Sequence, residues 1–454
     1  MFLKKAITVV VTALMVLSVF TGCAKKEETT TTTEGTTTET TADTGSADTS
    51  TEKKDVTITF GTHQSALPTS GIVQELAKDF EAETGIKVDF QIVPDAQWRD
   101  LLKAKLSSGE APDIFAADAD PLSLYDRVRP DENCVDLTSE EFVSRMDPSV
   151  LPSISYEGKT YGITFPGYKV WVYVYNKEIF SKLGLEIPKN YEELKAVAQK
   201  IKDSGVTPMW EATQNGWHQV LPLFESGPLY ETQTADLYKK LNDNEMKVAD
   251  IPQLKTIITQ MKEFADLGYF GEDYLSNTME SDMQAFAEGK VAMVLEGIGW
   301  PGQVAAEYPE MKDNMGIFVM PWGDNQIVGI NPASNAYFAN SKSEHIEEVL
   351  EFFRFLARPE NLQKRLDGDP GSLMICWPEI ASKFPQEYTD YLGSLESGTV
   401  MQVGVKYIDP QWMDVGKDLE AMFTGALSVD DVIASIEQRR ADQATLQQDP
   451  AWNK

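Results

Sequence analysis

The chain has 454 residues, of which 42% are hydrophobic and 24% are charged, so it is long enough for two lobes and has a globular composition. Acidic residues outnumber basic ones by 71 to 40, which gives a formal net charge of −31 at pH 7. Such a charge repels nucleic acid and anionic lipid headgroups, so no polyanionic partner is expected.

The N-terminal segment predicts export. An apolar run at 6–20 follows two lysines; it is shorter than a membrane span of about 20 residues and has the length of a signal-peptide core. The run ends in "FTGC", which resembles the lipobox of bacterial lipoproteins except that Phe20 stands where leucine is usual. The resemblance implies a signal peptide at 1–22 and acylation of Cys23, which would anchor the protein on the extracellular face of the cell membrane. The alternative is an uncleaved signal anchor.

After Cys23 the chain is rich in threonine up to residue 54 and contains no aromatic residue. Such a tract cannot bury enough surface to offset its ordering entropy, so 23–54 is predicted to be a disordered linker. Two further cysteines, Cys134 and Cys376, lie far apart in the sequence. An exported protein permits a disulfide between them, but two separate buried thiols are the preferred interpretation.

Strands and helices alternate through the rest of the chain, which predicts an α/β fold. Ser70 and Ser343 are expected to cap helices, and Asn190 with Glu193 forms a capping box. The expected strands lie at 56–60, 88–92, 113–118, 170–175, 206–209 and 291–295, and the expected helices at 72–84, 97–108, 190–203, 251–267, 279–288 and 346–358, with a helical tail from 409.

Aromatic and polar residues gather where these strands end, and ligands bind beyond the carboxyl ends of strands in open parallel sheets. A sugar ring packs its C–H face on an indole, and carboxylate or amide groups hold its hydroxyls. Of the tryptophans, Trp300 between glycines and a proline is the best candidate for such a platform, whereas Trp171 suits a core and Trp98 a partly packed helix surface. A single tryptophan is nevertheless more often a core residue.

Signals for catalysis are weak. The three histidines are widely separated, and no metal-ligand spacing, nucleophile elbow or phosphate-binding loop is present in the sequence. With 71 acidic residues, neighbouring carboxylates such as Asp118 and Asp120 are inevitable and do not by themselves indicate a glycosidase. No enzyme activity, cofactor or metal is therefore predicted.

Several segments together resemble the extracellular solute-binding proteins of ABC importers, in the carbohydrate-binding group that includes maltose-binding proteins. They include "LAKDFEAETGIKV", "YNKEIFSKLGL" and "MQAFAEGKVAMVLEGIGW", and they cover most of 55–359. The resemblance implies a two-lobed periplasmic-binding-protein-like fold of type II, with the ligand between lobes joined by crossing strands. It implies an N-terminal lobe of 55–164 plus 321–368 and a C-terminal lobe of 165–320 plus 369–454, with crossings near 163–166, 318–321 and 368–376.

The resemblance also implies a carbohydrate ligand, an ABC permease as partner and a monomeric binding protein. Maltose binders carry a carboxylate where this chain has Lys169, so a neutral maltodextrin is doubtful; the lysine either pairs with an acidic sugar or faces solvent or a salt bridge. The implied ligand-binding residues are His63, Gln64, Asp118, Asp120, Tyr168, Lys169, Trp210, Glu211, Trp300 and Trp412.

Two other classes remain open from the sequence. The net acidity would suit a binder of a non-sugar solute such as a polyamine. A surface glycosidase or lyase is the second alternative, although no activated set of residues favours it.

Overall fold

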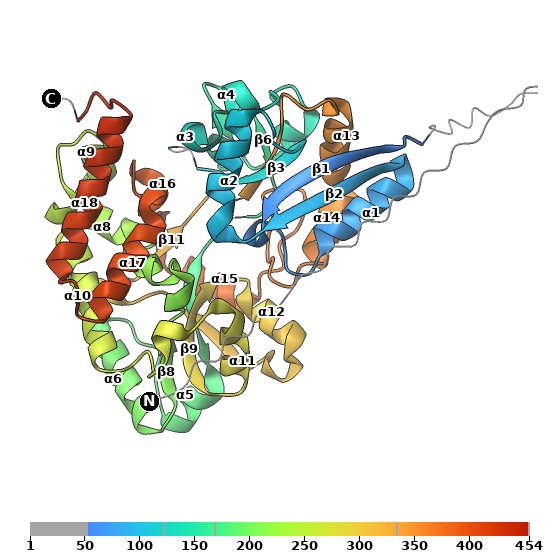
Figure 1. Ribbon diagram of the computed structural model, residues 1–454. Helices are drawn as coiled ribbons and strands as arrows, with labels where there is room; N and C mark the ends of the chain where they lie inside the picture. Colours follow the sequence, from blue (N-terminus) through green and yellow to red (C-terminus); the bar gives the residue numbers. More distant parts are fainter. Residues whose placement is uncertain (1–52, 121, 123, 168, 333–334, 453–454) are drawn as a thin grey trace, which may run out of the picture. The chain divides into compact units, whose positions relative to one another are not determined.

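The computed structural model describes residues 53–120, 122, 124–167, 169–332 and 335–452 (Figure 1). The contacts divide the chain into residues 1–50 and 51–454, and only the second unit contains described residues. The predicted signal peptide at 1–22, Cys23 and nearly all of the predicted linker lie outside the described residues.

A mixed five-stranded sheet builds what we call the first lobe. Strand β1 pairs in parallel with both β2 and β3, whereas β12 runs antiparallel to its neighbours β3 and β6. The parallel strands β1 and β3 therefore end at the same edge of the sheet. In order across the sheet, the strands are β2 Ile86–Val93, β1 Val56–His63, β3 Ile114–Asp118, β12 Asn335–Ala339 and β6 Gly162–Thr164.

The helices of the first lobe form because their apolar residues recur at helical spacing and bury one side. In α1, Leu76 and Phe80 are fully buried, and Gly85 at φ 82° ends the helix. Phe80 packs on Phe352 of α13, with ring centroids 5.1 Å apart. The helices are α1 Ile72–Thr84, α2 Asp95–Ser108, α3 Leu124–Val128, α4 Pro130–Asn133, α13 Ile346–Leu356 and α14 Pro359–Asp367 (Figure 1).

A second sheet of four strands builds the second lobe, which has its own hydrophobic clusters. Strands β8 and β9 are parallel, and β7 runs antiparallel to β9 and β10. Residues 291–295 of β9 are all buried, as expected for a central strand covered on both faces. The order is β10 Met315–Phe318, β7 Trp171–Asn176, β9 Val291–Gly297 and β8 Thr207–Trp210.

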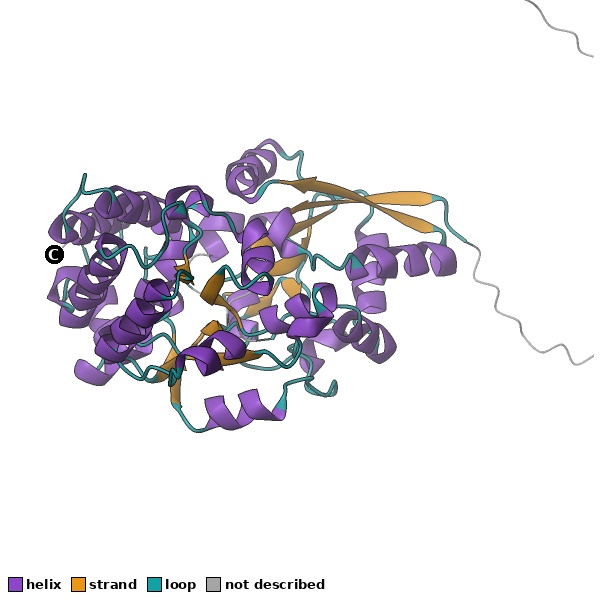
Figure 2. Cartoon of the chain, turned by 90° about the horizontal axis from the view of Figure 1, so that it is seen from below, coloured by secondary structure: helices purple, strands orange, loops and turns teal. Residues whose placement is uncertain are grey.

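Helices surround the strands of the second lobe, as Figure 2 shows in purple and orange. Asn190 caps α6 by accepting a hydrogen bond from the backbone N–H of Glu193. The helices are α5 Lys177–Leu183, α6 Tyr191–Asp203, α7 Leu221–Phe224, α8 Gly227–Gln233, α9 Leu237–Asn242, α10 Pro252–Asp266, α11 Asp282–Ala287, α12 Trp300–Glu307, α15 Gln386–Gly393, α16 Met401–Gly404, α17 Trp412–Phe423 and α18 Val429–Leu446.

Two short sheets complete the fold. Strand β11 Ile327–Ile330 pairs in parallel with β13 Glu396–Thr399, and β4 Ser155–Tyr156 pairs with β5 Lys159–Thr160. The predicted α/β class with two lobes is confirmed. The predicted boundaries of the lobes, at 164/165, 320/321 and 368/369, stay a prediction.

Two predicted helix caps are wrong. The N-cap of α1 is Gly71 rather than Ser70, and that of α13 is His345 rather than Ser343. The Ser343 hydroxyl instead donates to Asp113 and accepts from the backbone N–H of His345, which fixes the turn before the helix.

Candidate functional site

Three chain segments connect the lobes and hydrogen-bond to one another. The backbone N–H of Gly167 donates to Met374 O at 3.3 Å, and that of Cys376 donates to Phe165 O at 3.0 Å. Lys169 and Asn331 exchange two backbone hydrogen bonds of 2.9 Å. The polypeptide between β6 and β7 is therefore tied to both of the other connections, which is the arrangement of a hinge.

The two strand ends of the first lobe bring His63 and Asp118 together. The parallel strands β1 and β3 end in these residues, and His63 Nε2 lies 3.9 Å from Asp118 Oδ1. The imidazole also stacks on Trp98, which is buried and donates to Ala116 O at 2.8 Å, so the expectation of a partly packed helix surface is wrong. Burial lowers the pKa of His63 below its usual value, so the side chain is neutral at pH 7.

Asp118 is held by two arginines that the sequence did not single out. Arg99 Nη2 lies 2.8 Å and Arg127 Nη1 3.5 Å from Asp118 Oδ2. Burial alone would raise the pKa of Asp118, but the charges of the two guanidinium groups outweigh it and hold this pKa well below the usual range. Asp118 is therefore ionised throughout the physiological pH range.

The same arginines reach across to the second lobe. Arg127 forms an ion pair with Asp409, which begins the 3₁₀ turn Asp409–Gln411 before α17, and Arg99 lies 3.9 Å from the same carboxylate. Gln447, the residue directly after α18, donates to Asp126 of α3 at 2.5 Å. These contacts lie beside a small cavity of about 10 Å³ that residues of both lobes line: Asp120, Leu122, Asp126, Gln402, Val405, Tyr407, Asp409 and Pro410.

The other two residues predicted on the first lobe differ in exposure. Asp120 is buried, and its carboxylate accepts from the backbone N–H of Leu122 at 2.8 Å, which is the contact of a turn. Gln64 begins the 3₁₀ turn Gln64–Ala66 and is exposed. Both follow strand ends, as predicted.

In the second lobe, Glu211 follows β8 and is buried against His218. His218 Nδ1 lies 2.6 Å from Glu211 Oε1, and His218 Nε2 lies 2.9 Å from Leu295 O of β9. Burial would lower the pKa of His218, but the Glu211 carboxylate raises it above its usual value, which favours an imidazolium that donates from both nitrogens. Glu211 thus has a hydrogen-bond partner inside the lobe.

The three predicted tryptophan platforms are held by neighbouring groups. Trp210 Nε1 donates to Thr278 O at 3.2 Å, and Trp412 Nε1 donates to Trp217 O at 2.9 Å; both rings are half-buried. Trp210 borders a pocket of about 360 Å³ formed by residues 207–291 of the second lobe. Trp300 is only 5% exposed and packs edge-to-face on Phe286 at 5.2 Å. The rigid rings of Trp210 and Trp412 keep some surface for a ligand, and Trp300 keeps least.

Close packing requires glycine at position 299, directly before Trp300. A Cβ on Gly299 would lie 1.6 Å from Gly371 O, so only glycine allows the connecting segment to approach the start of α12 so closely.

Sequence reasoning also missed a buried acid in the second lobe. Glu225 lies directly after α7, and its Oε1 accepts from Gln402 Nε2 at 2.6 Å. Its Oε2 has no hydrogen-bond partner among the described residues. Burial raises the pKa of Glu225 to about 8, so the carboxyl is mostly protonated at pH 7. No local pattern marks Glu225 or Arg127, because their partners come from distant segments.

Most of the predicted site residues thus lie just at or after strand ends of the two lobes, whereas Trp412 begins α17 and Lys169 lies on a connecting segment. Tyr168 lies outside the described residues, as does Cys23. Cys134 and Cys376 are both buried free thiols. Within the described ranges, no three His, Cys, Asp or Glu side chains are arranged to hold a metal ion, and no helix is long and apolar enough to cross a membrane.

Comparison with known proteins gives the family. Residues 66–363 match the bacterial extracellular solute-binding proteins. A multiple sugar-binding protein of Streptococcus mutans is 24% identical over 67% of this chain and 72% of its own. The diacetylchitobiose binding protein of Streptomyces coelicolor is 29% identical over 54% of this chain and 56% of its own.

A solved structure has the same fold. The sugar transporter of Bacillus licheniformis in complex with stachyose is 21% identical in sequence, and it superposes with a TM-score of 0.69 over 84% of this chain and 99% of its own. The family match covers more than half of the sequence, and the two-lobed α/β fold agrees with it. The chain therefore belongs to the bacterial extracellular solute-binding proteins.

Proposed function

We propose that this protein captures a sugar or oligosaccharide outside the cell by closure of its two lobes and delivers it to the membrane permease of an ABC importer. The observation that carries the proposal is the contact of Arg127 with Asp409 beside Asp118. This contact brings the strand ends of the first lobe next to the second lobe. A ligand bound there would touch both lobes. The names of the two curated relatives, both sugar binders, support the same ligand class.

Side chains near the strand ends and the start of α17 suit a sugar. Half-buried Trp412 and Trp210 offer rigid apolar rings for the C–H face of a pyranose. Polar atoms without a hydrogen-bond partner among the described residues include His63 Nδ1, Glu225 Oε2 and Gln402 Oε1. Buried polar groups cost free energy unless they are paired, and sugar hydroxyls can both donate and accept.

The three hydrogen-bonded connections support closure by rotation of the lobes. Because each lobe has its own hydrophobic clusters, a rotation about residues 165–167, 169, 331–332 and 374–376 would leave both cores intact. No step of covalent chemistry is needed, and we propose a binding protein rather than an enzyme.

We further propose that Cys23 is acylated and that the threonine-rich linker tethers a monomeric protein near the permease. Two or three acyl chains hold a protein on a bilayer, and the tether keeps its local concentration high. Mass spectrometry of the mature N-terminus tests this part: an unmodified Cys23, or an uncleaved N-terminus, would contradict it.

A thermal-shift screen tests the function. A saccharide at 100 times its Kd should stabilise the folded protein by about 2.7 kcal/mol and raise Tm. The panel contains neutral and acidic mono- and oligosaccharides, with putrescine and spermidine as the polyamine arm. A Tm that rises only with polyamines, or with nothing, would contradict the proposal.

A further inference from the structure

Lys169 lies on the segment that connects β6 with β7, and it is half-buried. Its backbone is fixed by the two hydrogen bonds with Asn331. Within the part of the chain that the structure describes, its ammonium group has no carboxylate within 4.0 Å, in contrast to exposed lysines such as Lys417, which lies 3.1 Å from Asp414. A partly desolvated cation without a counter-ion is unfavourable, so it calls for an explanation.

The charge of Lys169 acts on both lobes. Burial lowers the pKa of His63 in the first lobe, and the charge of Lys169 lowers it further. In the second lobe burial raises the pKa of Glu225 to about 8, and the charge of Lys169 opposes that rise. The ammonium group is therefore within electrostatic range of strand-end residues of both lobes.

The nearby acids are not available to neutralise Lys169. Asp118 is already paired with Arg99 and Arg127. Glu225 is mostly protonated at pH 7 and is hydrogen-bonded by Gln402. His63 is neutral, and its Nδ1 has no hydrogen-bond partner in the described chain although the residue is only 6% exposed. One unpaired positive charge and one unused polar nitrogen thus remain near the hinge.

We propose that the ligand is an acidic sugar and that Lys169 binds its carboxylate. The inference rests on the proposed function and names its substrate class. A carboxylate would give Lys169 the charge-assisted hydrogen bond that it lacks, and a neighbouring hydroxyl would reach His63. A sugar phosphate fits less well, since it carries about 1.5 to 2 negative charges at pH 7 and the two nearby arginines already have carboxylate partners.

Calorimetry at pH 7 with matched ligands tests the proposal. The pairs are digalacturonic acid with its methyl ester and with galactobiose, and cellobiouronic acid with cellobiose; galactose 6-phosphate is the phosphate arm. For the pair that binds, the acid should bind at least about tenfold more tightly than its neutral analogue, the usual range for a hydrogen bond to a charged group. Equal affinity, preference for the neutral sugar or preference for the phosphate would overturn the inference and leave sugar capture standing. If no saccharide binds, both proposals fail.

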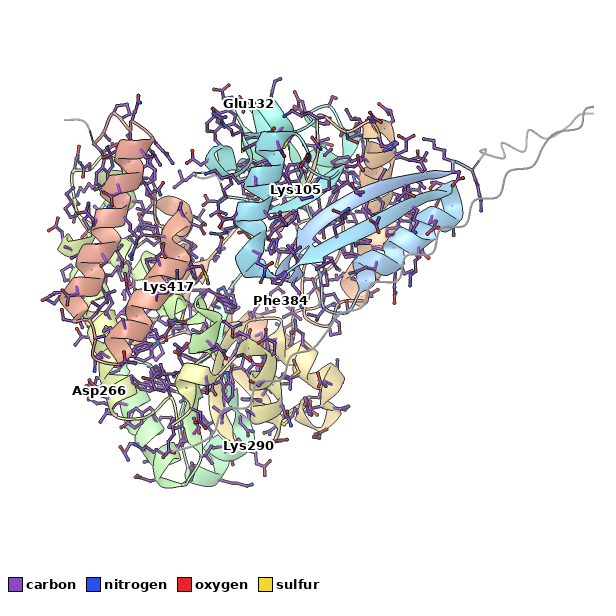
Figure 3. All side chains as sticks on the ribbon, viewed as in Figure 1. Lys105, Glu132, Asp266, Lys290, Phe384 and Lys417 are labelled. Carbon is purple, nitrogen blue, oxygen red and sulfur yellow. The ribbon has the colours of Figure 1, made fainter. Side chains whose placement is uncertain are left out.

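Variants assign the effect to Lys169. In the Lys169→Met protein the preference for the acid over the neutral analogue should fall by about tenfold, and Lys169→Arg should retain the preference. Lys417→Met, on α17 and labelled in Figure 3, removes an exposed lysine and should change neither affinity. A Lys169→Met protein that still prefers the acid would overturn the assignment. If that variant does not fold, the ester comparison on the unaltered protein and Lys169→Arg still decide the question.

Discussion

At the strand ends of the first lobe Asp118 is ionised and paired with two arginines, whereas Glu225 in the second lobe is buried and mostly protonated at pH 7. Asp118 lies between Arg99 and Arg127, which hold its pKa well below the usual range against the effect of burial. In the second lobe burial raises the pKa of Glu225 to about 8.

Burial also acts on two further acids of the second lobe, Asp282 and Glu296. Both are buried and share a hydrogen bond, and burial raises the pKa of each. The comparison teaches that ionic strength should change saccharide affinity mainly through the first lobe and its link to Asp409. The pH should change the free energy of unfolding mainly through the second lobe.

The largest expected effect concerns the buried pair of the second lobe. His218→Ala would leave the Glu211 carboxylate buried without its partner, which should lower the free energy of unfolding by about 3–5 kcal/mol. Urea denaturation followed by circular dichroism measures the loss. His345→Ala, at a half-buried position before α13, is the control and should cost far less. A loss no larger than that of the control would show that the pair does not stabilise the lobe.

The next effect is a pH dependence. Because the pKa of Glu225 is raised in the folded state, its contribution to stability is full below the carboxyl's unfolded pKa and is lost as pH rises towards about 8. Glu225→Gln removes this titration, so the variant should gain about 4 kcal/mol relative to the unaltered protein between pH 5 and pH 9. Denaturation at a series of pH values tests it, with the exposed Glu396→Gln as control. Parallel pH profiles for the two proteins would contradict the assignment.

The smallest effect belongs to the contact between lobes. Asp409→Asn removes the carboxylate that Arg127 meets across the boundary, so saccharide affinity should fall by a factor of about five, or about 1 kcal/mol. Calorimetry at 50 and 500 mM salt should show that the unaltered protein loses affinity with salt more steeply than the variant. Asp414→Asn, in an exposed pair with Lys417, is the matched control. Identical affinities and salt dependences for all three proteins would remove the cross-lobe ion pair from the account.

Much of the fold could be predicted from the sequence because its signals are local. The apolar stripe of α13 and the alternation of β1 and β2 depend on residues a few positions apart. The expected helix at 346–358 ends close to α13, and Pro359 directly after it begins α14, because proline suits the first turn of a helix.

The partners within the site could not be predicted, because they depend on distant contacts. Arg127 meets a residue nearly three hundred positions away, at Asp409. His218 is seven residues from Glu211, but its other partner is Leu295. The positions of the strand ends predicted which side chains lie near one another. Tertiary packing decides which of these side chains already have a partner inside the protein.

Small-angle scattering tests the central claim, capture by closure of two lobes, most directly. The radius of gyration of the unaltered protein should fall when a saccharide that raises Tm is added at saturation, and a saccharide that leaves Tm unchanged should not alter it. An unchanged radius of gyration with a saturating, bound saccharide would contradict the account.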